Sequence, residues 1–165
     1  MKKIHLLRHA KSDWENKTHA DIDRPINERG VRTAIFMASQ LQNAGYAFVH
    51  VYCSPAVRAQ STIELISEHL LEIDFQWQVD NALYTFDSHR LHEWFRLLDE
   101  SIDEVSIIGH NPALTIFCNQ LSNSSITNMP TCGYAQLTAS RECIWQDISE
   151  TPFELSVFLK PKDLM

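Results

Sequence analysis

Short apolar runs alternate along the chain with longer segments in which apolar residues recur at helical spacing. The first run, residues 4–7, is bounded by polar residues and is typical of a strand buried on both faces. After Asn27 the spacing changes, and one apolar stripe along a helix is formed by Val31, Ala34, Ile35, Ala38 and Leu41. Gly45 follows as a C-terminal cap, so the pattern predicts a helix between Asn27 and Gly45.

The alternation of strand and helix patterns continues after this helix. β-Branched and aromatic residues at 48–53 predict a second strand. Ser54 and Pro55 then have the residue types of a helix cap and a first helical turn. Alternating apolar residues at 73–79 predict a third strand with one buried face. Ser88 is expected to cap a third helix.

The second half of the chain completes the predicted fold. An apolar strand is predicted at 105–109, and Asn111 and Pro112 are expected to open the helix that follows it. Late strands are predicted at 133–139 and 153–159. Because strands alternate with helices, we expect an α/β three-layer sandwich with helices on both faces of a mostly parallel central sheet, and an antiparallel strand late in the chain.

Length and composition narrow the class of protein. The chain of 165 residues is long enough for a hydrophobic core, and we expect one domain over residues 1–165. Its formal net charge of -7 argues against nucleic-acid binding, which needs many cations to neutralise phosphates. No apolar run approaches the roughly 20 residues of a membrane span. We therefore expect a cytoplasmic protein with no nucleic-acid and no membrane partner.

The cysteines do not form a metal-binding or disulfide pattern. They lie far apart, without a C-x-x-C motif, at Cys53, Cys118, Cys132 and Cys143. In a reducing compartment such residues act as small apolar side chains. His89 and His92 are one helical turn apart but have no nearby third ligand, so neither a metal site nor a cofactor is expected.

Cationic and titratable side chains collect where predicted strands end. Arg8 and His9 follow the first strand, Arg58 follows the second, and His110 follows the strand at 105–109. In open α/β sheets, ligands bind beyond the carboxyl ends of the strands. We therefore expect these four side chains to converge at one edge of the sheet.

This set of residue types favours phosphoryl transfer without a metal. Arginine presents a planar fork of donors that matches phosphate oxygens. A neutral histidine can attack phosphorus and form a phosphohistidine. A second histidine, when protonated, can stabilise the negative charge that spreads over the phosphoryl oxygens in the transition state.

Four ordered motifs carry a resemblance to a known family. The segments "LLRHAKSDW", "DRPINERG", "SPAVRAQST" and "GHNPAL" resemble the histidine phosphatase superfamily, which is phosphoglycerate mutase-like, and within it the short SixA-type phosphohistidine phosphatases. The resemblance implies that His9 is the phosphorylated nucleophile, that His110 is the second active-site histidine, and that Arg8 and Arg58 hold the phosphate. It also implies that the carbonyl of residue 10, here Ala10 where the superfamily usually has glycine, accepts the other ring N–H of the nucleophile.

The identity of a proton donor stays open in the sequence. Superfamily members that cleave phosphate esters usually carry a carboxylic acid soon after the third strand. The segment there offers Asp80, Asp87 and Glu93, none of them in a clear motif. A phosphohistidine substrate needs such an acid less, because its leaving group is an imidazole nitrogen rather than an alkoxide. The hypothesis is that the enzyme has no dedicated acid.

The expected reaction is removal of a phosphoryl group from a phosphohistidine on a partner protein, such as a phosphotransfer domain. The chain has no insertion long enough to form a lid over a small molecule. Two alternatives are a small-molecule phosphomonoesterase of the same superfamily and a non-catalytic phosphate-binding module. Lys11 and Asp13 could line the rim or only solvate the surface, and Arg24 is expected to pair with Asp21 or Asp23.

Overall fold

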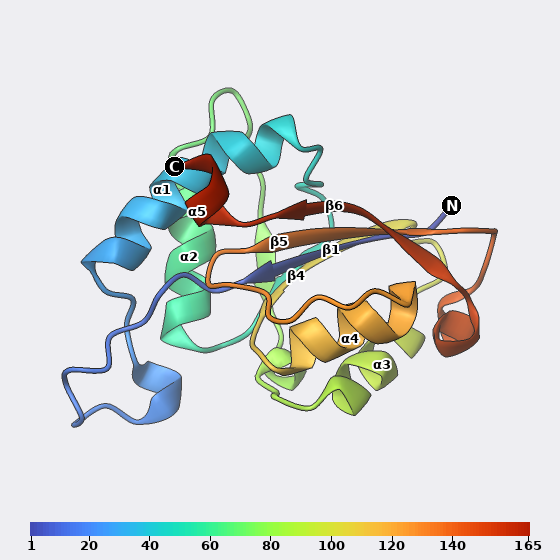
Figure 1. The fold of residues 1–165 in the computed structure, drawn as a ribbon, viewed down its shortest axis with the longest axis horizontal. Coiled ribbons are helices and arrows are strands. Elements are labelled where there is room, and N and C mark those ends of the chain that lie inside the picture. The colour runs from blue at the N-terminus through green and yellow to red at the C-terminus, as the bar shows by residue number, and fades with distance from the viewer.

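The computed structural model describes residues 1–165 as a six-stranded mixed sheet covered by helices on both faces (Figure 1). The strands are β1 (Lys3–Arg8), β2 (Val51–Cys53), β3 (Trp77–Val79), β4 (Glu104–Gly109), β5 (Tyr134–Ala139) and β6 (Phe153–Leu159). They lie in the order β3-β2-β4-β1-β5-β6. The first four strands run parallel, and β5 is antiparallel to both of its neighbours, which confirms the predicted α/β sandwich.

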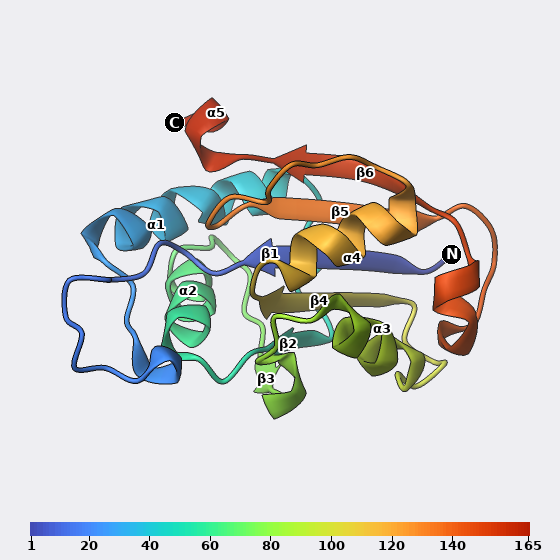
Figure 2. The same cartoon turned by 60° about the horizontal axis from the view of Figure 1, so that its bottom comes forward.

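The helices divide between the two faces of the sheet (Figure 2). They are α1 (Glu28–Asn43), α2 (Val57–Glu68), α3 (Ser88–Arg96), α4 (Ala113–Ser122) and α5 (Pro161–Leu164), with short 3-10 turns η1 (Asp21–Asp23), η2 (Asn81–Leu83) and η3 (Trp145–Glu150). Helices α1 and α2 pack on one face, whereas α3, α4 and η3 pack on the other. No helix has both the length and the apolar character needed to cross a membrane.

Two predicted strands are shorter than the sequence pattern suggests. β2 begins at Val51 rather than residue 48, because His50 has a left-handed backbone with φ of 49°. β3 covers only Trp77–Val79 of the predicted strand at 73–79. It is an edge strand whose only neighbour is β2, and β2 offers only three residues to pair with. Phe75 is nevertheless buried, through packing in the core rather than through strand pairing.

Two helix starts also differ from the predictions. α2 begins at Val57 with Ala56 as its N-cap, while the Ser54 hydroxyl accepts a hydrogen bond from the Ala56 N–H and shapes the turn before the helix. For α3 the N-cap is Asp87 rather than Ser88. The Asp87 carboxylate accepts from the N–H two residues later, and a negative group is favoured at that end of a helix.

The predictions for α1 and α4 agree more closely with the structure. The Asn27 side chain caps α1 by accepting from the Gly30 N–H, and Gly45 follows the helix with φ of 86°. α4 begins at Ala113, and the Asn111 side chain accepts from both the N–H and the hydroxyl of Thr115. The N-cap of α4 is Pro112 rather than Asn111, so the helix begins one residue later than the motif predicted.

The strand register determines which side chains meet at the carboxyl edge of the sheet. β1 pairs with β4 so that Arg8 lies opposite Gly109, and β2 pairs with β4 so that Cys53 lies opposite Ile108. The next residues in these three strands therefore leave the sheet side by side. This brings His9 beside His110 and places Ser54 on the other side of His110.

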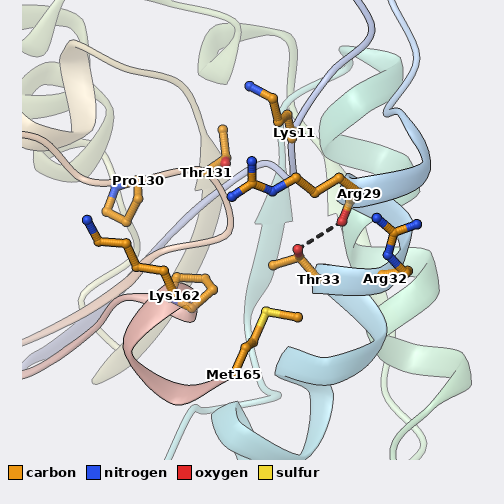
Figure 3. A pocket seen from close by; sticks show the side chains of 9 residues that line it. Lys11, Arg29, Arg32, Thr33, Pro130, Thr131, Lys162 and Met165 are labelled. Carbon is orange, nitrogen blue, oxygen red and sulfur yellow. Dashed lines mark hydrogen bonds between the residues drawn. The ribbon is translucent and has the colours of Figure 1, made fainter.

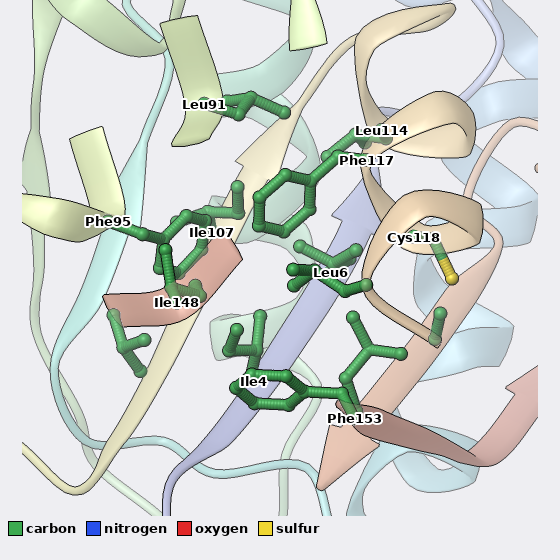
Figure 4. Packing of buried hydrophobic residues seen from close by; sticks show 14 of the residues in the cluster. Ile4, Leu6, Leu91, Phe95, Ile107, Leu114, Phe117, Cys118, Ile148 and Phe153 are labelled. Carbon is green, nitrogen blue, oxygen red and sulfur yellow. The ribbon is translucent and has the colours of Figure 1, made fainter. Parts of the chain in front are cut away.

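β1 is central because both of its faces are buried. Ile4 and Leu6 point into the core formed with α3 and α4, whereas Leu7 points into the core formed with α1 and α2, and all three are fully buried. Figure 4 shows Ile4 next to Phe153, and Leu6 in the same core as the rings of Phe117 and Phe95. These two rings stack at 4.9 Å between centroids, so α4 and α3 are fixed to each other as well as to the sheet.

We expect Phe117→Ala to lower the free energy of unfolding by about 3–5 kcal/mol, because it leaves a cavity under α3 and α4. Chemical denaturation measures this change. Leu97→Ala is the matched control: Leu97 is 87% exposed, and its loss should change stability by less than about 0.5 kcal/mol. Similar losses in both variants would contradict this description of the core.

Candidate active site

The four predicted site residues do converge on one pocket at the carboxyl edge of the sheet. The pocket has a volume of about 260 Å³. Its lining includes Arg8 and His9 after β1, Arg58 in α2 and His110 after β4. The remaining lining residues are Lys11, Ser12, Trp14, Asp21, Arg24, Phe86, Asn111 and Thr131. Catalysis by these residues stays a prediction; their proximity is a structural observation.

His9 is held in a single tautomer. Its Nδ1 lies 2.7 Å from the Ala10 carbonyl oxygen, which can only accept, so Nδ1 carries the proton. The other ring nitrogen, Nε2, is then left with its lone pair. This is the contact that the resemblance predicted for the residue after the histidine, and alanine makes it as well as glycine would.

His110 lies against His9, with 5.3 Å between the ring centroids. Its Nε2 lies 2.7 Å from the Ser54 hydroxyl, and its Nδ1 lies 3.4 Å from an Arg58 guanidinium nitrogen. Because guanidinium only donates, Nδ1 of His110 is the acceptor and Nε2–H donates to Ser54. Ser54 thus orients the second histidine, a function beyond the helix cap that its position in the sequence suggested.

Arg8 and Arg58 are anchored by backbone carbonyls. Arg8 donates to the Met129 carbonyl at 2.9 Å, and Arg58 donates to the Asp21 carbonyl at 2.7 Å. The Nε of each guanidinium is buried without a partner in the protein, so both arginines keep donors that the protein does not satisfy. The pKa of Arg8 is lowered by burial and by the charge of Arg58. An anion placed between these side chains would accept hydrogen bonds from the free donors and would offset the repulsion between the two guanidinium groups.

Asp21 is the acid that pairs with the arginines of the pocket. Its carboxylate lies 2.8 Å from Arg24 and 3.1 Å from Arg58, and it accepts a short hydrogen bond from the Tyr84 hydroxyl. Partial burial by itself raises the pKa of Asp21, but hydrogen bonds from Arg24, Tyr84 and Arg58 outweigh burial, so the net pKa lies below its ordinary value. Asp21 is therefore ionised at neutral pH and holds no proton to donate.

Arg24 has both the structural role that the sequence predicted and a place in the pocket lining. It pairs with Asp21, donates to the Ser12 hydroxyl, and stacks on the Trp14 ring at 3.7 Å from the centroid. Lys11 also lines the pocket, whereas Asp13 does not and instead accepts from the Glu15 N–H. The rim position considered for Lys11 is thus observed.

Two contacts fix the loop after β1 against its neighbours. The Ala10 N–H donates to the Thr62 hydroxyl at 2.9 Å, and this hydroxyl donates to the Arg58 carbonyl, which ties the loop to α2. On the other side, Gly30 of α1 lies against the same loop. A Cβ atom at residue 30 would come within 2.3 Å of the Lys11 carbonyl oxygen, so only glycine allows this approach.

Burial and positive charge keep both histidines neutral. The pKa of His9 is lowered to about 3 by burial, which outweighs the Ala10 hydrogen bond, and by the charges of Arg58, Arg8 and Arg24. The pKa of His110 is lowered to about 3 by burial, by His9 and by Arg58. His9 is thus a free base at neutral pH, as a nucleophile requires. The sequence predicts a protonated second histidine, but the surroundings of His110 disfavour its cationic form in the free protein.

None of the three carboxylic acids considered as proton donors lines the pocket. Asp80 caps η2 and accepts from the Trp94 indole, and Asp87 caps α3. Glu93 lies on the exposed side of α3. Asp80 and Asp87 are thus engaged as helix caps, and Glu93 faces solvent.

Several residues close to the candidate site do not belong to the strand-end histidines and arginines that the sequence singles out. Tyr84 and Phe86 place their rings 5.4 and 5.5 Å from that of His110. Both come from the loop between η2 and α3, which carries no motif. The sequence suggests Asp21 and Asp23 only as ion-pair partners of Arg24. The second contact of Asp21 is with Arg58, which is 37 residues away in the chain.

Comparison with known proteins decides the family. Residues 4–87, just over half of the chain, match the sequence profile of the histidine phosphatase superfamily (branch 1). The chain belongs to this superfamily. This membership confirms the resemblance carried by the sequence motifs and identifies the protein as a phosphatase of the histidine phosphatase type. It is also 27% identical, over 94% of its length, to the whole of an uncharacterized protein of Mycobacterium leprae (strain TN).

Solved structures share the fold of this histidine phosphatase. The protein histidine phosphatase SixA complexed with tungstate matches with a TM-score of 0.79 and 20% identity, over 99% of both chains. A mycobacterial glucosyl-3-phosphoglycerate phosphatase complexed with VO3 matches with a TM-score of 0.70 and 14% identity, over 95% of this chain and 98% of that one. At these identities the likeness concerns the fold alone, and the same fold accommodates both enzymes.

The lowered histidine pKa values predict a loss of stability in acid. Between about pH 6.5 and pH 3 the unfolded chain binds protons at His9 and His110 that the folded chain does not, so the free energy of unfolding falls as the pH falls. At pH 5 the loss is about 2 kcal/mol for each histidine relative to pH 7.5. Urea unfolding of wild type and His9→Asn/His110→Asn at both pH values measures it. Equal acid sensitivity of the two proteins would contradict the prediction.

Proposed function

We propose that this histidine phosphatase removes the phosphoryl group from a phosphohistidine on a partner protein, through a covalent phosphohistidine on His9. The tautomer of His9 supports its role as nucleophile, because Nε2 carries the lone pair while Nδ1 is bound to the Ala10 carbonyl. Arg8 and Arg58 hold the transferred phosphoryl group, and their unsatisfied donors supply the hydrogen bonds. These charges come from the chain itself, so we propose a reaction without a metal or cofactor.

The reaction has two displacement steps. The Nε2 lone pair of His9 forms a bond to phosphorus while the bond from phosphorus to the substrate imidazole breaks. The electron pair stays on that nitrogen, which takes a proton from water. In the second step a water oxygen attacks the phosphorus of phospho-His9 and loses a proton. His9 leaves as neutral imidazole and inorganic phosphate is released.

His110 changes its protonation state when the substrate binds. Burial and neighbouring cations hold its pKa low in the free protein, and the negative charge of a bound phosphoryl group opposes those cations. Its Nδ1 is the ring nitrogen without a proton in the free protein, so it takes up the proton and then donates to a phosphoryl oxygen in place of its contact with Arg58. His110 then stabilises the charge of the transition state, as the sequence analysis expected of a protonated second histidine.

The lack of a proton donor is the observation that carries the choice of substrate. Asp21 is the single carboxylate of the pocket, and it is engaged by Arg24, Arg58 and Tyr84 with a lowered pKa. A phosphate ester leaves as an alkoxide and needs an acid, whose help is typically worth about 10²- to 10⁴-fold in rate. An imidazole leaving group needs far less help. The pocket is therefore better suited to a phosphohistidine than to an ester.

A protein substrate is also supported by the rim of the pocket. Trp14 and Phe86 line it with side chains that are 68% and 47% exposed, and exposed aromatic residues of this kind are common at protein interfaces. Two alternatives stay open. A small-molecule phosphomonoesterase shares the fold, as the glucosyl-3-phosphoglycerate phosphatase shows, but would lack its acid here. A non-catalytic phosphate-binding module would keep the arginines and bind phosphate without forming a phosphoenzyme.

His9→Ala should lower turnover of phosphoramidate, and of a phosphohistidine peptide, by more than about 10³-fold, because the lone pair of His110, the other histidine of the pocket, is engaged by Arg58. Rapid quenching of wild type should trap a phosphoenzyme that is stable in alkali and labile in acid, and that is missing in His9→Ala. Turnover of wild type should be unchanged in EDTA. If His9→Ala kept the wild-type rate on both substrates, the proposed nucleophile would be wrong.

Asp87→Asn and Glu93→Gln should each change kcat on phosphoramidate and on p-nitrophenyl phosphate by less than about threefold, since neither carboxylate reaches the pocket. Wild type should turn over phosphoramidate faster than alkyl phosphates, whose leaving groups need an acid. A loss of 100-fold or more on alkyl phosphates in either variant would identify a general acid and favour the phosphomonoesterase.

A further inference from the structure

A second, larger hollow lies directly beside the catalytic pocket. It has a volume of about 430 Å³ and lies between the first turns of α1, the loop before β5 and the short helix α5. It is lined by Lys11, Arg29, Arg32, Thr33, Pro130, Thr131, Pro161, Lys162 and Met165. Because Lys11 and Thr131 also line the catalytic pocket, the two hollows adjoin. Figure 3 shows Arg29 reaching toward Thr131, with Lys162 extending from the opposite side.

The lining of this hollow is strongly basic. It contains four cationic side chains, Lys11, Arg29, Arg32 and Lys162, and no acidic one. This is the reverse of the whole chain, which carries a formal net charge of -7. We call the hollow lined by these four cationic side chains the basic hollow. Cations gathered in a concave surface focus a positive potential there, and that attracts a negatively charged partner.

The charges of the basic hollow are not used inside the protein. None of the four side chains forms a salt bridge, and none donates a side-chain hydrogen bond to a protein acceptor. Asp163 of α5 is paired with Lys160 instead, at 3.5 Å. By contrast, Arg24 and Arg58 both have a carboxylate partner. The four cations are therefore exposed and available to an external anion.

We propose that the basic hollow docks an acidic segment of the partner protein, with Asp or Glu side chains a few residues away from the phosphohistidine. This inference rests on the proposed function, since the phosphohistidine must enter the adjoining pocket. The cations come from three separate parts of the chain, before α1, on α1 and on α5, so they match several carboxylates spread along a segment better than one compact anion. Complementary charge of this kind mainly increases the rate of productive encounter.

The test uses two synthetic peptides of equal length that each carry one phosphohistidine. One has three aspartates beside it, and the other has three asparagines at the same positions. Wild type at low salt should have a kcat/KM about fivefold or more higher for the aspartate peptide, because each exposed ion pair contributes only modestly. This preference should disappear at 0.5 M NaCl, where charges on the surface are screened.

Arg29→Gln/Arg32→Gln should abolish the preference for the aspartate peptide while leaving the turnover of phosphoramidate unchanged. Arg96→Gln/Arg141→Gln is the matched control. It removes the same charge at the other end of the sheet, where these arginines donate only to the Ser149 hydroxyl and the Glu150 carbonyl. The control should keep the wild-type preference.

Three outcomes would overturn the docking site. The first is equal use of both peptides by wild type. The second is a loss of the preference in the control variant as full as in the α1 variant. The third is competition by pyrophosphate at low concentration with both peptides equally in wild type and not in the α1 variant, which would assign the basic hollow to a small anion. Failure of the proposed function is distinct from all three outcomes, because wild type would then not turn over phosphoramidate.

Discussion

The parallel pairing of β1 with β4 is the interaction on which the active site depends. It sets Arg8 opposite Gly109, so that the residues that follow, His9 and His110, leave adjacent strands at the same height. The pairing is stable because both strands are buried on both faces, with apolar side chains that alternate between the two cores. A shift of one residue would turn each apolar side chain to the opposite core and separate the two histidines. The same register therefore maintains the fold and the geometry of the candidate site.

Concentrated positive charge is the second constraint on the site. Arg8, Arg24 and Arg58 all line one small pocket, and such cations repel each other when water is excluded. Asp21 offsets part of this repulsion by pairing with two of them, and backbone carbonyls satisfy further donors. Burial and the remaining excess of positive charge together keep the histidines neutral. The pocket is thus organised for a group with two or more negative charges, and phosphate is such a group.

The sequence allowed the prediction of those parts of the protein that depend on local patterns. Apolar runs predicted the central strands, and the residue type at each strand end predicted the four converging side chains. What it could not show depends on contacts between distant segments. Ser54 looked like a helix cap until the register of β2 against β4 placed it beside His110. Arg24 had two candidate partners in the sequence, Asp21 and Asp23, and only the tertiary fold brings Arg58 to Asp21 as well. The short length of β3 likewise depends on its partner strand.

Gly30 has a consequence for how the two adjoining hollows communicate. The backbone of α1 touches the carbonyl of Lys11 with no side chain between them, and Lys11 is two residues after His9. Arg29 and Arg32 are carried on the same rigid first turns of α1. A displacement of these arginines is therefore passed through direct backbone contact to the loop that carries His9, with no flexible side chain in between. The close contact at Gly30 therefore couples the position of α1, which carries Arg29 and Arg32, to that of the loop after β1.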